Sequence, residues 1–321
     1  MSLMGYTNRV AWVDLTAGQV DYRPIAEEDA LKYIGARGLG VKYVFDNGPQ
    51  VVALSPDNIL CFMNGPLTGT DANMSGRMAI VTKSPLTGTV TDSHHGGWSA
   101  ARLKWAGFDG LVFKGMAATP VYAYIENGEV TLHDASDLWG KGVHETVKIM
   151  QERYGEPKTL SVIAIGPAGE NLVRFGCWIN ENDRASGRGG TGCVGGSKHL
   201  KAVVIRGKYQ DRPRPADKEA WKGAHDRAPP RSWTEKNVTS PARVASGLWH
   251  QRADEHQQHD GRVAGVQQQG DLLWRKWRVD QRRVGQGHIL VNDPTCHACP
   301  VACKKEVEIT SGPWLGCTWR A

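Results

Sequence analysis

The feature that most constrains the fold is a pair of strand-like segments, 121–126 and 129–131, joined directly by Asn127-Gly128. An Asn-Gly pair favours the positive φ angles of a two-residue hairpin turn, so the two segments are expected to pair in antiparallel fashion. A second hairpin is expected between 10–15 and 19–22, around a Thr-Ala-Gly turn. Local antiparallel pairing is therefore expected to organise the first part of the chain.

Further apolar and periodic segments extend this pattern. Strands are also expected at 59–63, 78–82, 110–114, 120–126, 129–133, 160–165 and 201–205. Helices are expected at 27–33, 98–106 and 143–154, with a glycine-rich loop at 35–40. Many strands joined by hairpins, with few helices between them, predict an α+β domain of antiparallel β-sheets with a few helices. They argue against a doubly wound parallel sheet.

Three cysteines, Cys296, Cys299 and Cys303, stand at C-x2-C-x3-C spacing, with Pro300 after the second. So many thiols in a short, polar, lysine-rich stretch are more typical of a ligand cluster than of core filling. Thiolates bind both zinc and iron–sulfur centres. The compact triplet favours a 4Fe-4S cluster, because zinc sites usually show two separated C-x2-C pairs or added histidines.

Length and charge restrict the remaining classes. The 321 residues can bury a sizeable core in one large domain or two ordinary ones. No apolar run has transmembrane length and no leader is recognised, so a soluble, cytoplasmic protein is expected. The other cysteines are scattered, which fits a reducing compartment. Arginines concentrated in 211–283 account for the formal net charge of +6, so nucleic-acid binding is not expected.

Three glycine-rich stretches pair glycine with arginine or histidine. They are 74–77, 92–97 and 183–192, named here the first, second and third glycine stretch. Glycine allows a backbone to approach a ligand closely, and arginine offers a planar fork that matches phosphate. Together they predict a site for a phosphate-bearing cofactor, although each alone is also compatible with an ordinary turn. Neither nucleotide-binding fingerprint is present, so no ATP or nicotinamide site is predicted.

Several ordered motifs carry a resemblance to a known family. The motifs are GPLTGT at 65–70, SGR at 75–77, TKSPLTG at 82–88, IGPAGENL at 165–172, RA with GRGG within 184–190, and the cysteine triplet. On these motifs, residues 4–208 resemble the N-terminal domain of the tungsten-containing aldehyde:ferredoxin oxidoreductase family. Residues 288–310 resemble the start of its cluster-binding region. The chain looks closest to the uncharacterised enterobacterial oxidoreductases of this family.

The resemblance implies an oxidoreductase in which tungsten or molybdenum is bound by two pterin cofactors that sit on the N-terminal domain. Such an enzyme would oxidise an aldehyde-like substrate with water and pass electrons through a 4Fe-4S cluster to a ferredoxin-like carrier. Magnesium would bridge the two pterin phosphates. A homodimer is compatible with the resemblance, whereas nucleic acid and a membrane span are not expected.

The resemblance also implies roles for individual residues. The expected cofactor-binding residues are Arg77, His94, Gly96, Arg184, Ala185 and Gly187. Arg77 would contact a pterin phosphate, and the backbone carbonyls of His94 and Ala185 would bind the magnesium. Better-known members have Asn-Ser where this chain has His94-His95, so a side-chain role for either histidine stays open. No catalytic residue is assigned.

The same resemblance places Cys296, Cys299 and Cys303 on the first three cluster ligands. The family's fourth cysteine, its remaining pterin contacts and its substrate-pocket acid/base residues lie in C-terminal domains, whereas this sequence stops at Ala321. Cys317 is not expected to replace the fourth ligand. The alternative to an active oxidoreductase is therefore a truncated, non-catalytic fragment, and the chain as written is expected to be inactive.

The aromatic composition changes abruptly after Tyr209. All five phenylalanines and all eight tyrosines lie at or before it, whereas seven of the twelve tryptophans lie after it. Neither helical nor strand periodicity follows. We hypothesise that residues from about 228 to 288, and again from about 315, are translated in a shifted frame, the alternative being a divergent or low-complexity insert. The predicted organisation is a bis-pterin-binding domain at 1–208, an irregular, frame-shifted segment at 209–288, and a truncated, helical start of the iron–sulfur-binding domain at 289–321.

Overall fold

The computed structural model describes residues 4–227, 290–292, 296–299, 306–308 and 318–320. The chain divides into two compact units. The first contains Met1–His225 together with Cys296–Ala298, and the second contains Asp226–Thr295 together with Cys299–Ala321. The predicted 4–208 domain therefore lies in the first unit, together with the first cysteine of the triplet.

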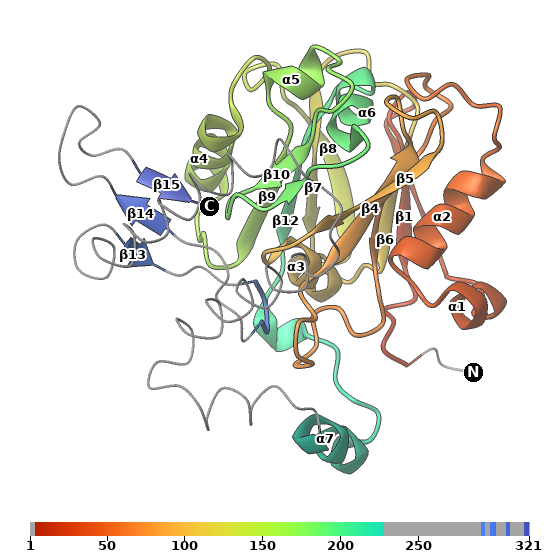
Figure 1. Ribbon diagram of the computed structural model, residues 1–321, viewed down its shortest axis with the longest axis vertical. Coiled ribbons are helices and arrows are strands. Elements are labelled where there is room, and N and C mark those ends of the chain that lie inside the picture. The colour runs from red at the N-terminus through yellow and green to blue at the C-terminus, as the bar shows by residue number, and fades with distance from the viewer. Residues whose placement is uncertain (1–3, 228–289, 293–295, 300–305, 309–317, 321) are drawn as a thin grey trace, which may run out of the picture. The chain divides into compact units, whose positions relative to one another are not determined.

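The first sheet has six strands in the spatial order β2-β1-β6-β3-β4-β5 (Figure 1). Its strands are β1 (Val10–Asp14), β2 (Gln19–Arg23), β3 (Leu60–Asn64), β4 (Met78–Lys83), β5 (Val90–His95) and β6 (Gly110–Lys114). Neighbouring strands run antiparallel, except that β1 and β6 run parallel. The β1–β2 pair confirms the hairpin predicted from the Thr-Ala-Gly turn.

The second sheet also has six strands, in the order β11-β10-β9-β12-β7-β8. Its strands are β7 (Val121–Glu126), β8 (Glu129–Asp134), β9 (Leu160–Ala164), β10 (Trp178–Asn180), β11 (Ala185–Ser186) and β12 (Leu200–Arg206). The β7–β8 hairpin confirms the Asn127-Gly128 turn, and both residues have positive φ angles. Because β12 pairs with β7 in parallel, each sheet is mixed. The α+β class is confirmed.

The central strands β3, β4, β6, β9 and β12 are buried at nearly every position because both faces of each sheet are covered. In β3, Leu60 and Phe62 pack into a core shared by the two sheets, whereas Cys61 and Met63 pack into a core on the outer face of the first sheet. Side chains alternate along a strand, so a strand buried on both faces needs a continuous apolar run. The continuous apolar run of β3 in the sequence is therefore explained by its burial on both faces of the sheet.

Helices cover the outer faces of both sheets (Figure 1). The first sheet is covered by α1 (Glu27–Tyr33) and α2 (Arg37–Asp46), and the second by α4 (Val143–Tyr154). Helix α3 (Ser99–Trp105) contributes Ala100 and Leu103 to the core between the sheets. The short elements α5 (Pro167–Glu170), α6 (Thr191–Ser197), η1 (Tyr209–Asp211) and α7 (Lys218–Arg227) complete the first part of the chain. No helix among the described residues is long and apolar enough to cross a membrane.

The loop predicted at 35–40 is wrong from Arg37 onward, because α2 begins there. The glycines were interpreted as backbone freedom for a loop. Gly40 instead allows close packing, since a Cβ built there would lie 2.6 Å from a methyl of Val81 in β4. A larger residue would push the helix away from the first sheet.

The described residues near the end of the chain form strands, which corrects the helical region expected there. They are β13 (Leu290–Asn292), β14 (Glu306–Glu308) and β15 (Thr318–Arg320), paired antiparallel in that order. Residues 209–227 contain η1 and α7, and the rest of the segment to 288 lies outside the described residues.

A buried lysine makes the free energy of unfolding vary with pH in the alkaline range. Lys198 is fully buried, and its ammonium donates hydrogen bonds to the carbonyls of Pro56 (3.2 Å) and Gly115 (3.0 Å). Burial lowers the pKa of Lys198 from 10.5 to about 8. Between these pH values the unfolded chain binds more protons than the folded one. Unfolding free energy should therefore rise with pH, by at most about 1.4 kcal/mol per pH unit from this group.

We expect Lys198→Met to remove this contribution. Urea unfolding between pH 7.5 and 10.5 should give a smaller rise of stability with pH in the variant than in the wild type. Lys148→Met, at an exposed site on α4, is the matched control and should keep the wild-type slope. Equal slopes for the wild type and Lys198→Met would contradict the assignment.

Candidate cofactor site and cysteine motif

The first and second glycine stretches meet at one end of a strand pair. The second stretch was predicted as a loop, but its residues up to His95 belong to β5, which pairs with β4 so that His95 lies opposite Met78. Arg77 precedes β4 and Gly96 follows β5. Because the strands are antiparallel, these two residues leave the first sheet at the same end.

The third glycine stretch lies along the same strand. The Arg188 N–H donates to Ser93 Oγ (3.2 Å), and the Ser84 hydroxyl donates to the Gly189 carbonyl (2.7 Å). Nδ1 of His95 and Oγ of Ser186 are 2.9 Å apart. The edge strand β5 of the first sheet is thereby joined to the edge strand β11 of the second.

The start of the cysteine motif contacts the first two glycine stretches. The Gly97 N–H donates to Cys296 Sγ (3.1 Å), and the His297 N–H donates back to the Gly97 carbonyl (3.0 Å). In the first stretch, the Met74 N–H donates to the Ala298 carbonyl (2.9 Å). Elements predicted separately as cofactor loops and as a metal-binding motif therefore come together in the first unit.

His297 anchors this part of the motif. Only 3% of its surface is exposed, and its ring stands edge-on to Trp98 and Trp105, with centroid distances of 5.2 Å in both cases. Its Nε2–H donates to the Thr70 carbonyl (3.0 Å). Burial lowers the pKa of His297, which favours the neutral ring. His297 was not among the predicted site residues, and its one signal in the sequence is its position next to Cys296.

An open cavity of about 850 Å³ lies beside this anchor. It is lined by Asp71, Trp98, Trp105, Glu156, Lys158, Thr159, Gly207, Lys208, Tyr209, Gln210, His297 and Ala298. The lining combines aromatic faces with charges of both signs. This face can therefore accept a large group, but its chemistry does not select one ligand.

The predicted cofactor residues differ in exposure. Arg77, Ala185 and Gly187 are exposed, Arg184 is half-buried and Gly96 is buried. The backbone of Gly96 is thus enclosed, whereas Gly187 and the side chain of Arg77 remain accessible to an anion. This is the arrangement expected when backbone groups approach a phosphate and arginine side chains neutralise it.

The two adjacent histidines are in different environments. His94 is 43% exposed at its side chain, with Nε2 2.7 Å from Arg37 Nη2 and 3.4 Å from Asp92 Oδ2. Its imidazole therefore takes part in a surface cluster. His95 is fully buried, and burial together with the charge of Arg77 lowers its pKa to about 3. Its ring is neutral at physiological pH.

His95 was not among the predicted site residues. A second feature of its ring, besides the low pKa, points to a bound ligand. Among the described residues its Nε2 has no hydrogen-bond partner, although it is buried. A buried polar atom without a partner is costly unless a ligand or water satisfies it. An unsatisfied ring nitrogen near Arg77, beside the glycine backbone, fits a bound polar cofactor.

Two of the three motif cysteines lie among the described residues. Cys296 and Cys299 are partly exposed, and Cys303 lies outside the described residues. Among the residues that the structure describes, no group of three or more His, Cys, Asp or Glu side chains is placed to bind a metal ion. The 4Fe-4S ligand set therefore stays a prediction. The hydrogen bond from the Gly97 N–H fixes the position of Cys296 Sγ beside the second glycine stretch.

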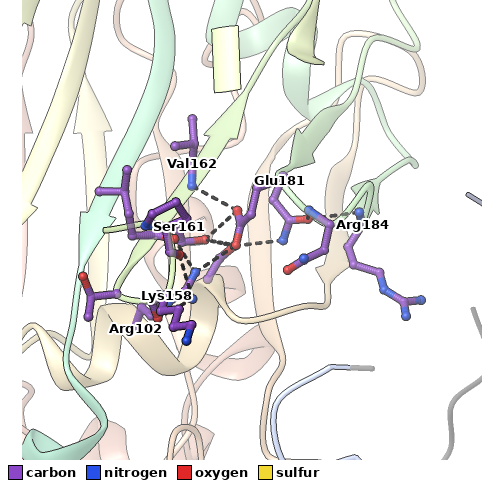
Figure 2. A network of polar contacts seen from close by, with 12 residues as sticks. Arg102, Lys158, Ser161, Val162, Glu181 and Arg184 are labelled. Carbon is purple, nitrogen blue, oxygen red and sulfur yellow. Dashed lines mark hydrogen bonds and ion pairs between the residues drawn. The ribbon is translucent and has the colours of Figure 1, made fainter. Parts of the chain in front are cut away.

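A buried carboxylate supports the third glycine stretch (Figure 2). Glu181 accepts hydrogen bonds from Arg102 Nη1 (3.0 Å), Ser161 Oγ (2.9 Å) and the Val162 N–H (3.0 Å). Burial raises the pKa of Glu181, whereas Arg102 opposes that rise. The network fixes the residue just before the turn that carries Arg184.

Comparison with known proteins identifies the class. Residues 10–207 match the family described as Aldehyde ferredoxin oxidoreductase, N-terminal domain, which is more than half of the chain. The chain belongs to this family, and the resemblance inferred from its motifs is confirmed.

Individual relatives agree with this assignment. A tungsten-containing aldehyde ferredoxin oxidoreductase of Pyrococcus abyssi is 46% identical over 206 residues, which are 64% of this chain and 34% of that protein. The WOR-like subunit of an aliphatic sulfonate oxidoreductase of Pyrococcus furiosus is 31% identical over 343 residues, covering 98% of this chain and 51% of that protein.

A solved structure is also similar. It is described as the active site complex BamBC of benzoyl coenzyme A reductase in complex with 1,5 dienoyl-CoA. It aligns with a TM-score of 0.79 and 29% identity, over 99% of this chain and 49% of that chain. This chain thus spans between about a third and a half of the length of these relatives.

The buried ion pair gives a direct test of how the site is supported. We expect Glu181→Gln to lower the free energy of unfolding by about 3–5 kcal/mol, because it leaves the buried Arg102 without a counter-charge. Denaturant unfolding measures this change. Glu145→Gln, which breaks an exposed pair with Lys141, should cost about 0.5 kcal/mol or less. Similar losses in the two variants would show that the Glu181 network is not a buried support.

Proposed function

We propose that this chain is the cofactor-binding part of an oxidoreductase that binds tungsten or molybdenum through two pterins. The observation that carries the proposal is the convergence of three glycine stretches with the start of the cysteine motif. The family assignment and the printed names of the tungsten-containing relatives support it. Aldehyde-like substrates, a ferredoxin-like acceptor and a cytoplasmic location belong to the same proposal, as does a homodimer.

The residues present fit two phosphate-bearing pterins. Arg77 and Arg184 would neutralise the phosphates, and the backbone N–H groups around Gly96 and Gly187 would donate to them. The carbonyls of His94 and Ala185 would bind the bridging magnesium, for which oxygen ligands are suited. The unsatisfied Nε2 of His95 would donate to, or accept from, the bound cofactor.

When bound, the metal–pterin group would take up the two electrons released as an aldehyde-like substrate and water become a carboxylic acid. The chain's own residues would hold that group against the first sheet. Cys296, Cys299 and Cys303 would supply three thiolates to a 4Fe-4S cluster. The Gly97 N–H would then stabilise the charge on the first of them.

The second candidate is a non-catalytic fragment. The chain spans about a third of the length of the aldehyde ferredoxin oxidoreductases that it matches. The domain organisation at 1–208, 209–288 and 289–321 remains our proposal, including the shifted frame. Resequencing the DNA from the codon of Tyr209 past the stop tests it. Single-base shifts would support the longer oxidoreductase, and an unchanged frame would favour the fragment.

Metal content separates the two candidates. Purified from cells supplied with tungstate and iron, an oxidoreductase should contain tungsten or molybdenum and about four irons per chain, as one cubane requires. Elemental analysis measures both. A chain without either metal and without iron would support the fragment.

A variant tests the role of the exposed arginine. Arg77→Ala should lower the tungsten or molybdenum content by about tenfold, because one charge-assisted phosphate contact is worth about 1.5–3 kcal/mol. Arg23→Ala, on the far edge strand β2 where Arg23 pairs with the exposed Asp21 and stacks over Trp12, should leave the content unchanged. Equal metal contents in the wild type and Arg77→Ala would contradict phosphate binding by Arg77.

A further inference from the structure

Asn180, the last residue of β10, organises the turn that carries Arg184. Its side chain is buried, and its Oδ1 accepts hydrogen bonds from the N–H groups of Asn182 and Arg184, both at 3.0 Å. Its own N–H donates to the Arg184 carbonyl (3.1 Å), and its carbonyl accepts from the Asp183 N–H (2.8 Å). One residue thus fixes the main chain of the third glycine stretch at its start.

The other end of the same amide holds the second glycine stretch. Nδ2 of Asn180 donates to the Gly96 carbonyl (3.0 Å) and to Ser99 Oγ (2.9 Å). The two donors and two acceptor positions of the amide are therefore all used. These contacts join residues 84 and 81 positions apart in the sequence, so the side chain is a tertiary link and not a local cap.

The second glycine stretch is in turn hydrogen-bonded to the cysteine motif. Gly97, next to the carbonyl that Asn180 holds, exchanges hydrogen bonds with Cys296 Sγ and with the His297 N–H. Gly96 and Gly97 are closely packed against their neighbours. A Cβ at Gly97 would lie 2.6 Å from Asn180 Nδ2, and a Cβ at Gly96 would lie 3.2 Å from Cys296 Sγ.

We propose that Asn180 is the positioning residue that sets the third glycine stretch and Cys296 in a fixed relation, through Gly96 and Gly97. Its significance rests on the proposed function, since Arg184 would then bind a pterin phosphate and Cys296 a cluster iron. Two centres that exchange electrons require a reproducible separation, and supporting hydrogen bonds provide it. Asn180 would act through its hydrogen bonds to Gly96 and to the turn that carries Arg184.

The test uses the purified chain without cofactors and follows the thiol that Asn180 is inferred to position. Iodoacetamide alkylation, mapped by peptide mass spectrometry, gives a rate for each cysteine. Asn180→Asp keeps the shape and the acceptors but loses both donors and places a charge against the Gly96 carbonyl. The rate at Cys296 should rise about three- to tenfold, as expected for the loss of one or two buried hydrogen bonds.

Internal and matched controls separate positioning from general destabilisation. Cys61 and Cys193 are fully buried and should keep their rates, whereas Asn171→Asp, at an exposed position, should alter none. An unchanged rate at Cys296, or parallel rises at all three cysteines, would overturn the proposal. If Asn180→Asp does not fold, Ser99→Ala removes one of the acceptors and should raise the Cys296 rate by about twofold. An unchanged rate in that variant would also overturn it.

The outcome does not depend on the proposed function. Selective alkylation of Cys296 in Asn180→Asp, in a chain that binds neither tungsten, molybdenum nor iron, would support the positioning role while the oxidoreductase proposal failed. The converse outcome is a protein that contains both metals when produced with tungstate and iron, while Asn180→Asp leaves the Cys296 rate of the cofactor-free chain unchanged. In that case the oxidoreductase proposal would stand and the positioning role would fail.

Discussion

The face-to-face packing of the two sheets is the constraint on which the rest of the structure depends. Phe62 of the first sheet and Trp178 of the second are fully buried and meet edge-to-face, with ring centroids 5.3 Å apart. Burying two such side chains contributes several kcal/mol at about 25 cal/mol per Å². Because Trp178 lies on β10, this contact also sets the position of Asn180 two residues later. The contact thereby holds β10 against the first sheet, and the His95–Ser186 contact joins the edge strands β5 and β11.

The site lies where regular pairing ends and glycine backbone begins. The central strands are buried on both faces, so backbone groups able to meet a ligand remain at strand ends such as Gly96 and in the turn around Arg184. Buried polar groups, above all Glu181 with Arg102, hold these ends in place. Buried ion pairs contribute little to net stability but are costly to break. Their value in this domain is therefore geometric, since they support the residues that would hold an anionic cofactor.

Sequence reasoning succeeded where the information is local and failed where it is tertiary. The turn at Asn127-Gly128 and the motifs of the glycine stretches could be recognised from adjacent residues. Strand β5 was missed because it is polar and lies at a sheet edge, where alternation carries little hydrophobic signal. His95 and its partner Ser186 are 91 positions apart, so neither composition nor spacing could indicate that they meet. The family resemblance named the expected cofactor positions, which stay a prediction, but it did not identify the side chains that support them.

We propose that the three glycine stretches form one pterin-binding site next to Cys296. Anomalous diffraction at the tungsten edge, on crystals of the protein produced with tungstate, tests this proposal. We expect a tungsten peak bordered by the second and third glycine stretches, on the side where Arg77 is exposed. A tungsten peak elsewhere in the first unit, with Arg77 and Arg184 contacting no bound group, would contradict it.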